Sequence, residues 1–153
     1  MLNFHATMLT MIQSFVQTQT EVFEQVLAAK PTVVADAVLK REMIGESSLD
    51  EVLTNLAELL GISKTDALNV LGISRSRKSK NPTMNVELLD RTYSALTLFA
   101  RVAVVLGQDA ARTWFTTPKA NLDSATPVSL LATRVGMAKL ESLLSALEDG
   151  SFL

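Results

Sequence analysis

Apolar residues recur at three- and four-residue steps along the first 29 positions of the chain. This spacing places their side chains on one face of a helix, so it predicts one long amphipathic helix over residues 3–29. Pro31 ends that helix and can open a second one over residues 32–43, which Gly45 closes. The stripe on the first helix consists of Phe4, Met8, Met11, Ile12, Phe15, Val16, Phe23, Val26 and Leu27.

The same spacing predicts helices over 49–60, 64–71, 85–106, 109–118, 127–134 and 137–148, with a loop at 119–126. Ser48 and Glu51 have the spacing of a capping box at the start of the third helix. Thr126 is expected to cap the helix that Pro127 leads, and Gly136 to separate that helix from the last one. No segment alternates like a strand, so the predicted fold class is all-α.

The tetrapeptide Leu-Gly-Ile-Ser occurs twice, at residues 60–63 and 71–74. Each copy has the chemistry of a turn between helices, because glycine can end one helix and serine can cap the next. A helix-turn-helix reader of DNA needs one such turn. If the first copy is the turn, the reader is 64–71 and carries one cation, Lys64, and one acid, Asp66. If the second copy is the turn, a basic segment follows, so charge selects the second register.

In that register the candidate DNA contacts lie between the second turn and Pro82. Arginine can chelate guanine edges, and serine and lysine can hold phosphates. The segment is polar and short, and a solvated basic loop between helices is an equally open interpretation. A net charge of −2 argues against tight, non-specific binding of nucleic acid. The candidate residues are Ser74, Arg75, Ser76, Arg77, Lys78 and Lys80.

The residues give little support to an enzyme. Cysteine is absent, which excludes disulfides, thiolate metal sites and cysteine nucleophiles, and His5 is the only histidine. No glycine-rich phosphate loop is present. We therefore predict no catalytic residue, no metal and no cofactor. The first 15 residues lack an early Lys or Arg and are interrupted by polar residues, so we expect a soluble, cytoplasmic protein without a signal peptide or a membrane span.

The last third of the chain has a more particular order of features. It contains GQDAARTWFTTPKANL, then a proline-led helix with Leu-Leu, a glycine, and finally LESLLSALEDGSFL. This order resembles the toxin-binding domain of Xre/MbcA/ParS-type antitoxins over about 98–153. The stretch ISKTDALNVLGISRSRKSK is similar to the Xre-like helix-turn-helix of that family, over about 60–97. We predict an N-terminal helical extension (1–44), an Xre-like region (45–106) and a toxin-binding domain (107–153), arranged as a helical bundle.

The resemblance implies an antitoxin that neutralises a RES-domain toxin, which consumes NAD or transfers ADP-ribose. It implies that the C-terminal region occludes the toxin's active site, that the chain forms a homodimer, and that it represses its own promoter. Carried over by position, Trp114, Phe115, Pro118 and Leu122 build the toxin-binding subdomain. The tail that would reach the toxin consists of Glu148, Gly150, Ser151, Phe152 and Leu153.

Two other functions stay open at this point. The chain could be a stand-alone DNA-binding regulator that uses the basic segment after the second turn. It could also be a structural helical protein whose N-terminal stripe assembles with a partner helix. The apolar end of the tail suits burial in a partner, and a tail folded back on its own domain is the alternative.

Overall fold

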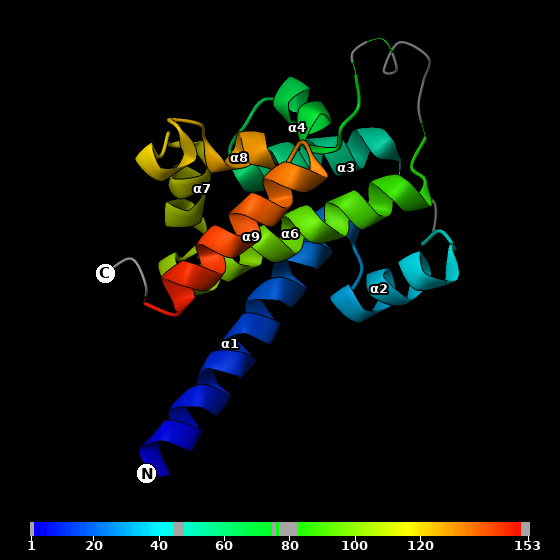
Figure 1. Ribbon diagram of the computed structural model, residues 1–153. Helices are drawn as coiled ribbons and strands as arrows, with labels where there is room; N and C mark the ends of the chain where they lie inside the picture. The colour runs from blue at the N-terminus through cyan, green and yellow to red at the C-terminus, as the bar shows by residue number, and fades with distance from the viewer. Residues whose placement is uncertain (1, 45–47, 75, 77–82, 151–153) are drawn as a thin grey trace.

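The computed structural model describes residues 2–44, 48–74, 76 and 83–150. Within these ranges every regular element is a helix and no strand occurs, which confirms the predicted all-α class (Figure 1). The elements in chain order are α1 (Leu2–Leu27), α2 (Pro31–Lys40), α3 (Leu49–Leu60), α4 (Lys64–Val70), α6 (Val86–Leu106), α7 (Gln108–Thr116), the 3₁₀ turn η1 (Ala120–Leu122), α8 (Pro127–Leu130) and α9 (Arg134–Glu148).

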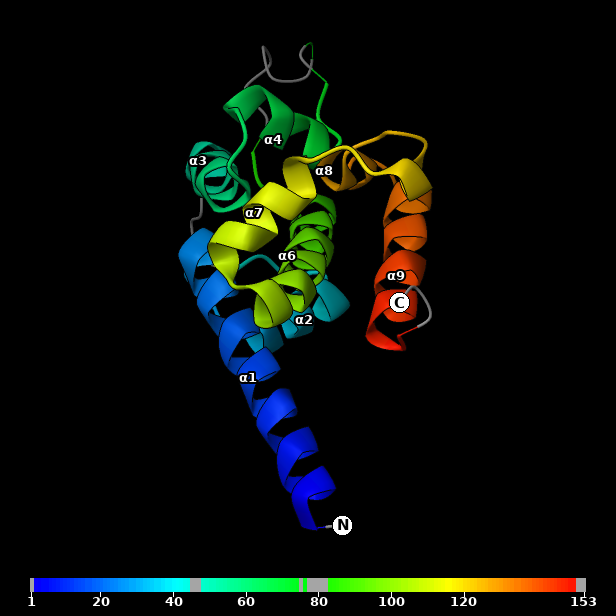
Figure 2. The same cartoon turned by 90° about the vertical axis from the view of Figure 1, so that its left-hand side faces the viewer.

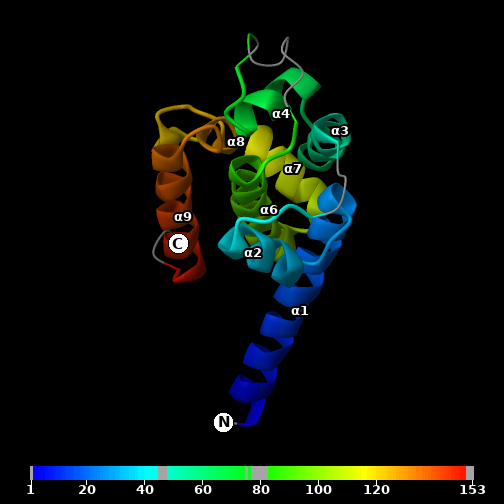
Figure 3. The same ribbon diagram turned by 90° about the vertical axis from the view of Figure 1, so that its right-hand side faces the viewer.

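Helix α6 is the centre of the molecule and packs against α1, α2, α7 and α9 (Figures 1 and 3). Its Tyr93 ring meets Phe23 of α1 edge-on, with ring centroids 5.2 Å apart. One turn and a half further on, its Phe99 ring packs against Phe115 of α7 at 5.5 Å. One hydrophobic core therefore extends from Val22 in α1 to Leu144 in α9, through α6.

The serine residues of the predicted caps and the glycine residues of the predicted turns set the helix boundaries as expected. The hydroxyl of Ser48 accepts from the Glu51 amide at the start of α3, and that of Ser63 accepts from the Asp66 amide at the start of α4. The turn glycines Gly61 and Gly72 both have φ of +66°, in the left-handed region where glycine ends helices. Two Leu-Gly-Ile-Ser copies therefore do form turns, one after α3 and one after α4.

The predicted boundary between the last two helices is wrong. The break comes earlier, because α8 ends at Leu130 and α9 already begins at Arg134. The hydroxyl of Thr133 caps α9 by accepting from the Gly136 amide at 2.9 Å. Gly136 lies in the first turn of α9, where a Cβ would stand 2.2 Å from the Leu130 carbonyl oxygen. This glycine lets α8 and α9 approach closely and does not interrupt a helix.

Smaller corrections concern three other boundaries. The helix predicted to reach residue 43 ends at Lys40, because Arg41 takes a left-handed φ of +57° and its amide bonds back to the helix. The first helix ends at Leu27 rather than 29, and Ala28 is left-handed. Thr126 makes no side-chain capping bond to α8, and the predicted loop 119–126 contains η1.

The structure divides the apolar stripe of α1 into a covered and an uncovered half. Val22, Phe23, Val26 and Leu27 are buried in the core. The N-terminal half of the helix extends beyond the rest of the molecule, as all three ribbon views show (Figures 1, 2 and 3). Its large apolar side chains are exposed there, namely Phe4, Met8, Leu9, Met11, Ile12 and Val16.

Across the described ranges, no single helix has the length and apolarity needed to cross a membrane, and only α6 and α7 taken together, bent by 119°, meet that test.

Candidate protein-binding module

The aromatic pair that the sequence places in the C-terminal module anchors α7 to α6. Phe115 is fully buried against Phe99. The Trp114 ring meets Phe115 edge-on at 5.1 Å and stays partly buried, with the Lys119 ammonium 5.2 Å from its centre. Such edge-to-face and cation–π contacts fix the ring orientation in addition to burying area. Phe115 is thus core, while one part of Trp114 lies at the surface of the module.

The segment after α7 closes on itself and presents Pro118 outward. The amide of Lys119 donates to the Ala125 carbonyl at 3.0 Å, and the Ser124 amide donates to the Lys119 carbonyl at the same distance. Leu122 is buried inside this loop, whereas Pro118 is exposed. The four residues predicted to build the module therefore come together on consecutive elements, with Phe115 and Leu122 as its interior and Pro118 on its surface.

An ion pair fastens the end of α9 to α6. Arg101 donates from Nε to Glu148 Oε1 at 3.0 Å and from a terminal nitrogen to Oε2 at 2.7 Å. The same guanidinium reaches the Ser145 hydroxyl at 3.3 Å. The hydrogen bond to Glu148 raises the pKa of Arg101, against the opposing effect of burial, and the charge of Glu141 adds to the rise.

This pair gives Glu148 a partner within its own chain. Its carboxylate remains about half exposed, with 46% of the side-chain surface accessible, so one side of it still faces solvent. Gly150 follows the helix with a left-handed φ of +73°. The remaining tail residues, Ser151, Phe152 and Leu153, lie outside the described residues.

The predicted DNA-reading segment is described only in part. The hydroxyl groups of Ser74 and Ser76 lie 3.0 Å apart, directly after the second turn. Arg75, Arg77, Lys78 and Lys80 lie outside the described residues. The choice between a recognition segment and a basic loop therefore stays a prediction.

Two arginines that the sequence analysis did not single out hold the two Leu-Gly-Ile-Ser turns. Arg112 of α7 donates from Nε to the Leu59 carbonyl at 2.8 Å and packs its stem over Gly61. The same guanidinium pairs with Asp109, one turn earlier on α7. A residue of the C-terminal module thus satisfies a carbonyl at the end of α3, which has no partner within its own helix.

Arg91 of α6 performs the corresponding task at the second turn. It donates to the Leu71 carbonyl at 3.3 Å and to the Ala132 carbonyl at 3.1 Å, so it bridges the end of α4 and the α8–α9 link. A Cβ on Gly72 would lie 1.8 Å from its guanidinium. The spacing of residues in the sequence does not identify either arginine as structurally important. Their partners are backbone carbonyls more than nineteen positions away, and local spacing carries no information about such distant contacts.

A cleft of about 920 Å³ separates α4 and both turns from α7 and α8, which face each other in Figure 2. Hydroxyl and small apolar groups line it, including those of Ser63, Thr116 and Ser129. Asp66 is the one charged side chain among the described residues of its lining, and its carboxylate accepts from the Ser63 hydroxyl at 2.8 Å. The described part of the wall carries no cation and is by itself poorly suited to phosphate.

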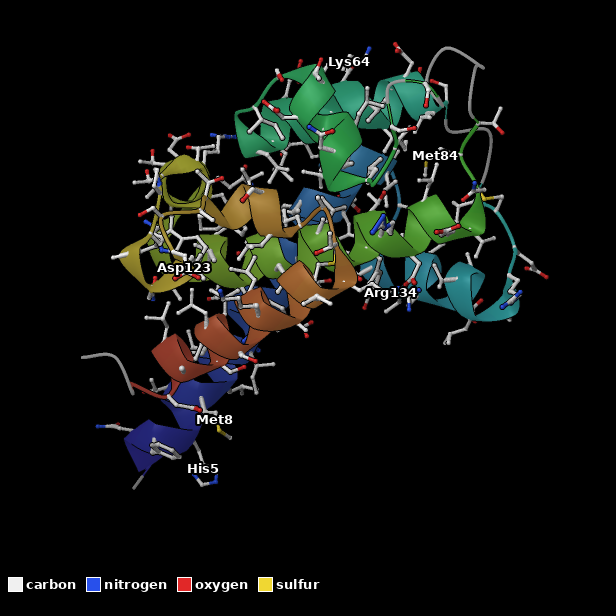
Figure 4. The ribbon with its side chains drawn as sticks, turned by 45° about the horizontal axis from the view of Figure 1, so that its top comes forward. His5, Met8, Lys64, Met84, Asp123 and Arg134 are labelled. Atoms are coloured by element: carbon white, nitrogen blue, oxygen red, sulfur yellow. The ribbon has the colours of Figure 1, made fainter. Side chains whose placement is uncertain are left out.

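Within the described part of the chain, no group of three or more His, Asp or Glu side chains comes together as metal ligands would. His5 lies on the projecting part of α1, near Met8 and away from the core (Figure 4). The segment from the end of α6 to α9 thus forms a small helical module packed on the rest of the core.

Comparison with known families agrees with this description. Residues 102–150 match the family model of the antitoxin Xre/MbcA/ParS C-terminal toxin-binding domain. The matched stretch runs from the second half of α6 through α7, η1, α8 and α9, and the match confirms the resemblance found in the sequence. It supports an antitoxin role, and the matched family binds toxins rather than catalysing a reaction. A search of curated proteins finds no match.

Proposed function

We propose that this chain is an antitoxin that binds a RES-type, NAD-consuming or ADP-ribosyltransferase-like toxin and occludes its active site with the segment that follows α9. The observation that carries the proposal is the toxin-binding-domain match over residues 102–150. The packing of the module supports it. Phe115 and the Arg101–Glu148 pair attach α7 and α9 to α6, so the chain end leaves a rigidly held helix.

The tail supplies the occluding group in this proposal. Residues 151–153 are Ser-Phe-Leu, and they follow a glycine with a left-handed φ of +73°. A terminal aromatic and aliphatic pair suits an apolar pocket, and a carboxylate near a helix end can meet a cationic rim. Enclosure of the tail by the toxin would close the NAD site without any chemistry by the antitoxin.

The test is co-expression of the toxin with tail variants. We expect that changing Phe152→Ser and Leu153→Ser together abolishes protection of the cells, because the occluding apolar group is lost. A matched control, Ser151→Ala, keeps the apolar pair and should protect as the parent chain does. Copurification measures complex formation separately from neutralisation. Full protection by the double variant would refute occlusion by the tail, and absence of any complex with the parent chain would refute the RES-type partner.

We propose further that the chain represses its own operon as a homodimer, with Ser74, Arg75, Ser76, Arg77, Lys78 and Lys80 at the DNA. The segment follows a turn whose glycine and flanking helix have the expected geometry. Four cations within six residues suit phosphate contacts, and a two-fold dimer suits a palindromic operator. No cofactor is required. A stand-alone DNA-binding regulator is the second candidate, favoured by the same turn and basic segment.

Replacement of Arg75, Arg77, Lys78 and Lys80 by Ala tests this part. We expect affinity for the chain's own promoter to fall by on the order of 100-fold or more. The slope of log affinity against log salt concentration should become shallower, by an amount that corresponds to the loss of up to about four phosphate contacts. A control with Lys30, Arg41, Lys119 and Lys139 replaced by Ala removes the same charge elsewhere. Equal DNA affinity in both variants would contradict a specific role for the basic segment. Repression that needs no toxin partner in the operon would favour the second candidate.

A further inference from the structure

The exposed half of α1 has one mostly apolar face, which also carries His5, and one neutral polar face. At about 100° per residue, its large apolar side chains fall within one half of the helical wheel, and Asn, Thr, Ser and Gln side chains fill the other half. Residues 2–20 contain no Asp, Glu, Lys or Arg. We define the α1 stripe as the exposed residues Phe4, Met8, Leu9, Met11, Ile12 and Val16.

The α1 stripe continues the face that the protein's own core covers further along the helix. Gln19 donates to the Thr97 hydroxyl at 3.4 Å and Phe23 contacts Tyr93, so α1 and α6 run antiparallel. In this register α6 ends at Leu106, level with about position 10 of α1. Val16, level with about position 100 of α6, is already 54% exposed, so α6 stops covering the stripe before its own end, where Val105 and Leu106 are themselves exposed.

An apolar face of this size is unusual for the surface of a monomer. Phe4 is 71% exposed and Met11 is 65% exposed. At roughly 100 Å² of surface per large apolar side chain, the six residues would remove about 600 Å² per chain from water, or about 1,200 Å² for a pair. This area reaches the lower end of the range for stable protein interfaces. A contiguous exposed patch of this kind marks a binding surface.

We propose that the α1 stripe is the surface on which a second copy of this chain docks, helix against helix. Self-association needs a surface that does not repel itself, and a helix segment without charged side chains meets that condition. Phe4, Met8, Met11 and Phe15 also alternate at four- and three-residue steps, the spacing of a helix–helix seam. A lipid surface is a poorer fit, because membrane-lying helices carry Lys and Arg on their polar face.

The inference rests on the homodimer of the proposed function, and it is tested without toxin or DNA. The mass of the full chain is measured in solution at protein concentrations on the order of 10 µM. We expect the parent chain to be a dimer. The double variant Met8→Glu, Ile12→Glu should be monomeric, with the dissociation constant raised by about 100-fold or more, because carboxylates would be buried without partners. Circular dichroism checks that the variant keeps its helices.

Two further variants make the test specific. Thr10→Glu with Ser14→Glu places the same charges, at the same spacing, on the polar face of α1, and it should leave the dimer intact. Met8→Lys with Ile12→Lys should be monomeric alone, and mixing it with the Glu variant should restore a dimer, which only pairing of stripe with stripe achieves.

A monomeric parent chain would overturn the inference, as would a dimer that persists in the Glu variant. So would a stripe that captures the toxin or vesicles of anionic lipid instead of a second chain. A dimer that assembles through the α1 stripe yet neutralises no toxin would support the inference while refuting the proposed function.

Discussion

At the scale of single residues, the two Leu-Gly-Ile-Ser turns are identical in sequence but not in environment. Gly61 and Gly72 share a φ of +66°, so both resist substitution by an L-residue. A Cβ on Gly61 would meet the Arg112 stem at 3.4 Å, an ordinary contact. At Gly72 it would overlap the Arg91 guanidinium, which is held between two carbonyls.

The difference predicts unequal effects of the same substitution. Gly61→Ala should lower the free energy of unfolding by about 1–2 kcal/mol, the penalty of a left-handed backbone. Gly72→Ala should lower it by about 1–3 kcal/mol more, because Arg91 must leave its partners. Denaturant unfolding measures both values.

A double-variant cycle identifies the cause. If the overlap with Arg91 is responsible, Gly72→Ala should be less damaging in an Arg91→Ala background than in the parent chain, so the two changes are not additive. Strict additivity would show that the backbone conformation alone accounts for the loss.

At the scale of elements, the Arg101–Glu148 pair decides how the end of α9 lies on α6. Glu148 is predicted to belong to the tail that contacts the toxin, yet in the structure it accepts two hydrogen bonds from Arg101. Both roles are compatible, because half of the Glu148 side chain is accessible. The guanidinium is charged at any pH at which the protein folds, and its raised pKa only extends that range upward, so substitution tests the pair better than pH does.

Glu148→Gln should lower the free energy of unfolding by about 0.5–1 kcal/mol, the usual contribution of a partly exposed ion pair. Glu141→Gln is the matched control, because that carboxylate influences Arg101 only through its charge and should change stability less. The charge-swapped chain, Arg101→Glu with Glu148→Arg, should regain the stability. If it also regains toxin neutralisation, Glu148 contributes only by holding α9 on α6. If it does not, the carboxylate contacts the toxin.

At the scale of the whole molecule, the parts predicted as separate regions share one hydrophobic core and are linked by the hydrogen bonds of two arginines. Arg112 extends from the C-terminal module to the end of α3, and Arg91 connects the second turn to the α8–α9 link. The turn before the basic segment and the toxin-binding module are therefore joined through one side chain, that of Arg91, which donates to a carbonyl of each.

The sequence by itself determined those features that depend on neighbours within a few residues. The helical spacing, the Ser48 and Ser63 caps and the turn glycines placed most boundaries, since each acts within one or two helical turns. The order of motifs after residue 98 was sufficient to identify the toxin-binding module, which the family match confirmed.

Only the tertiary structure decided the features that depend on distant segments. Gly136 reads as a helix breaker in the sequence, but it is a site of close approach because Leu130 lies against it. Arg91 and Arg112 look like solvated charges until their carbonyl partners are known. The stripe on α1 continues along one face in the sequence, and its division into core and exposed surface follows from where the packed neighbours of α1 stop covering it. Local spacing fixes which face of a helix is apolar, whereas the packed neighbours fix how much of that face is covered.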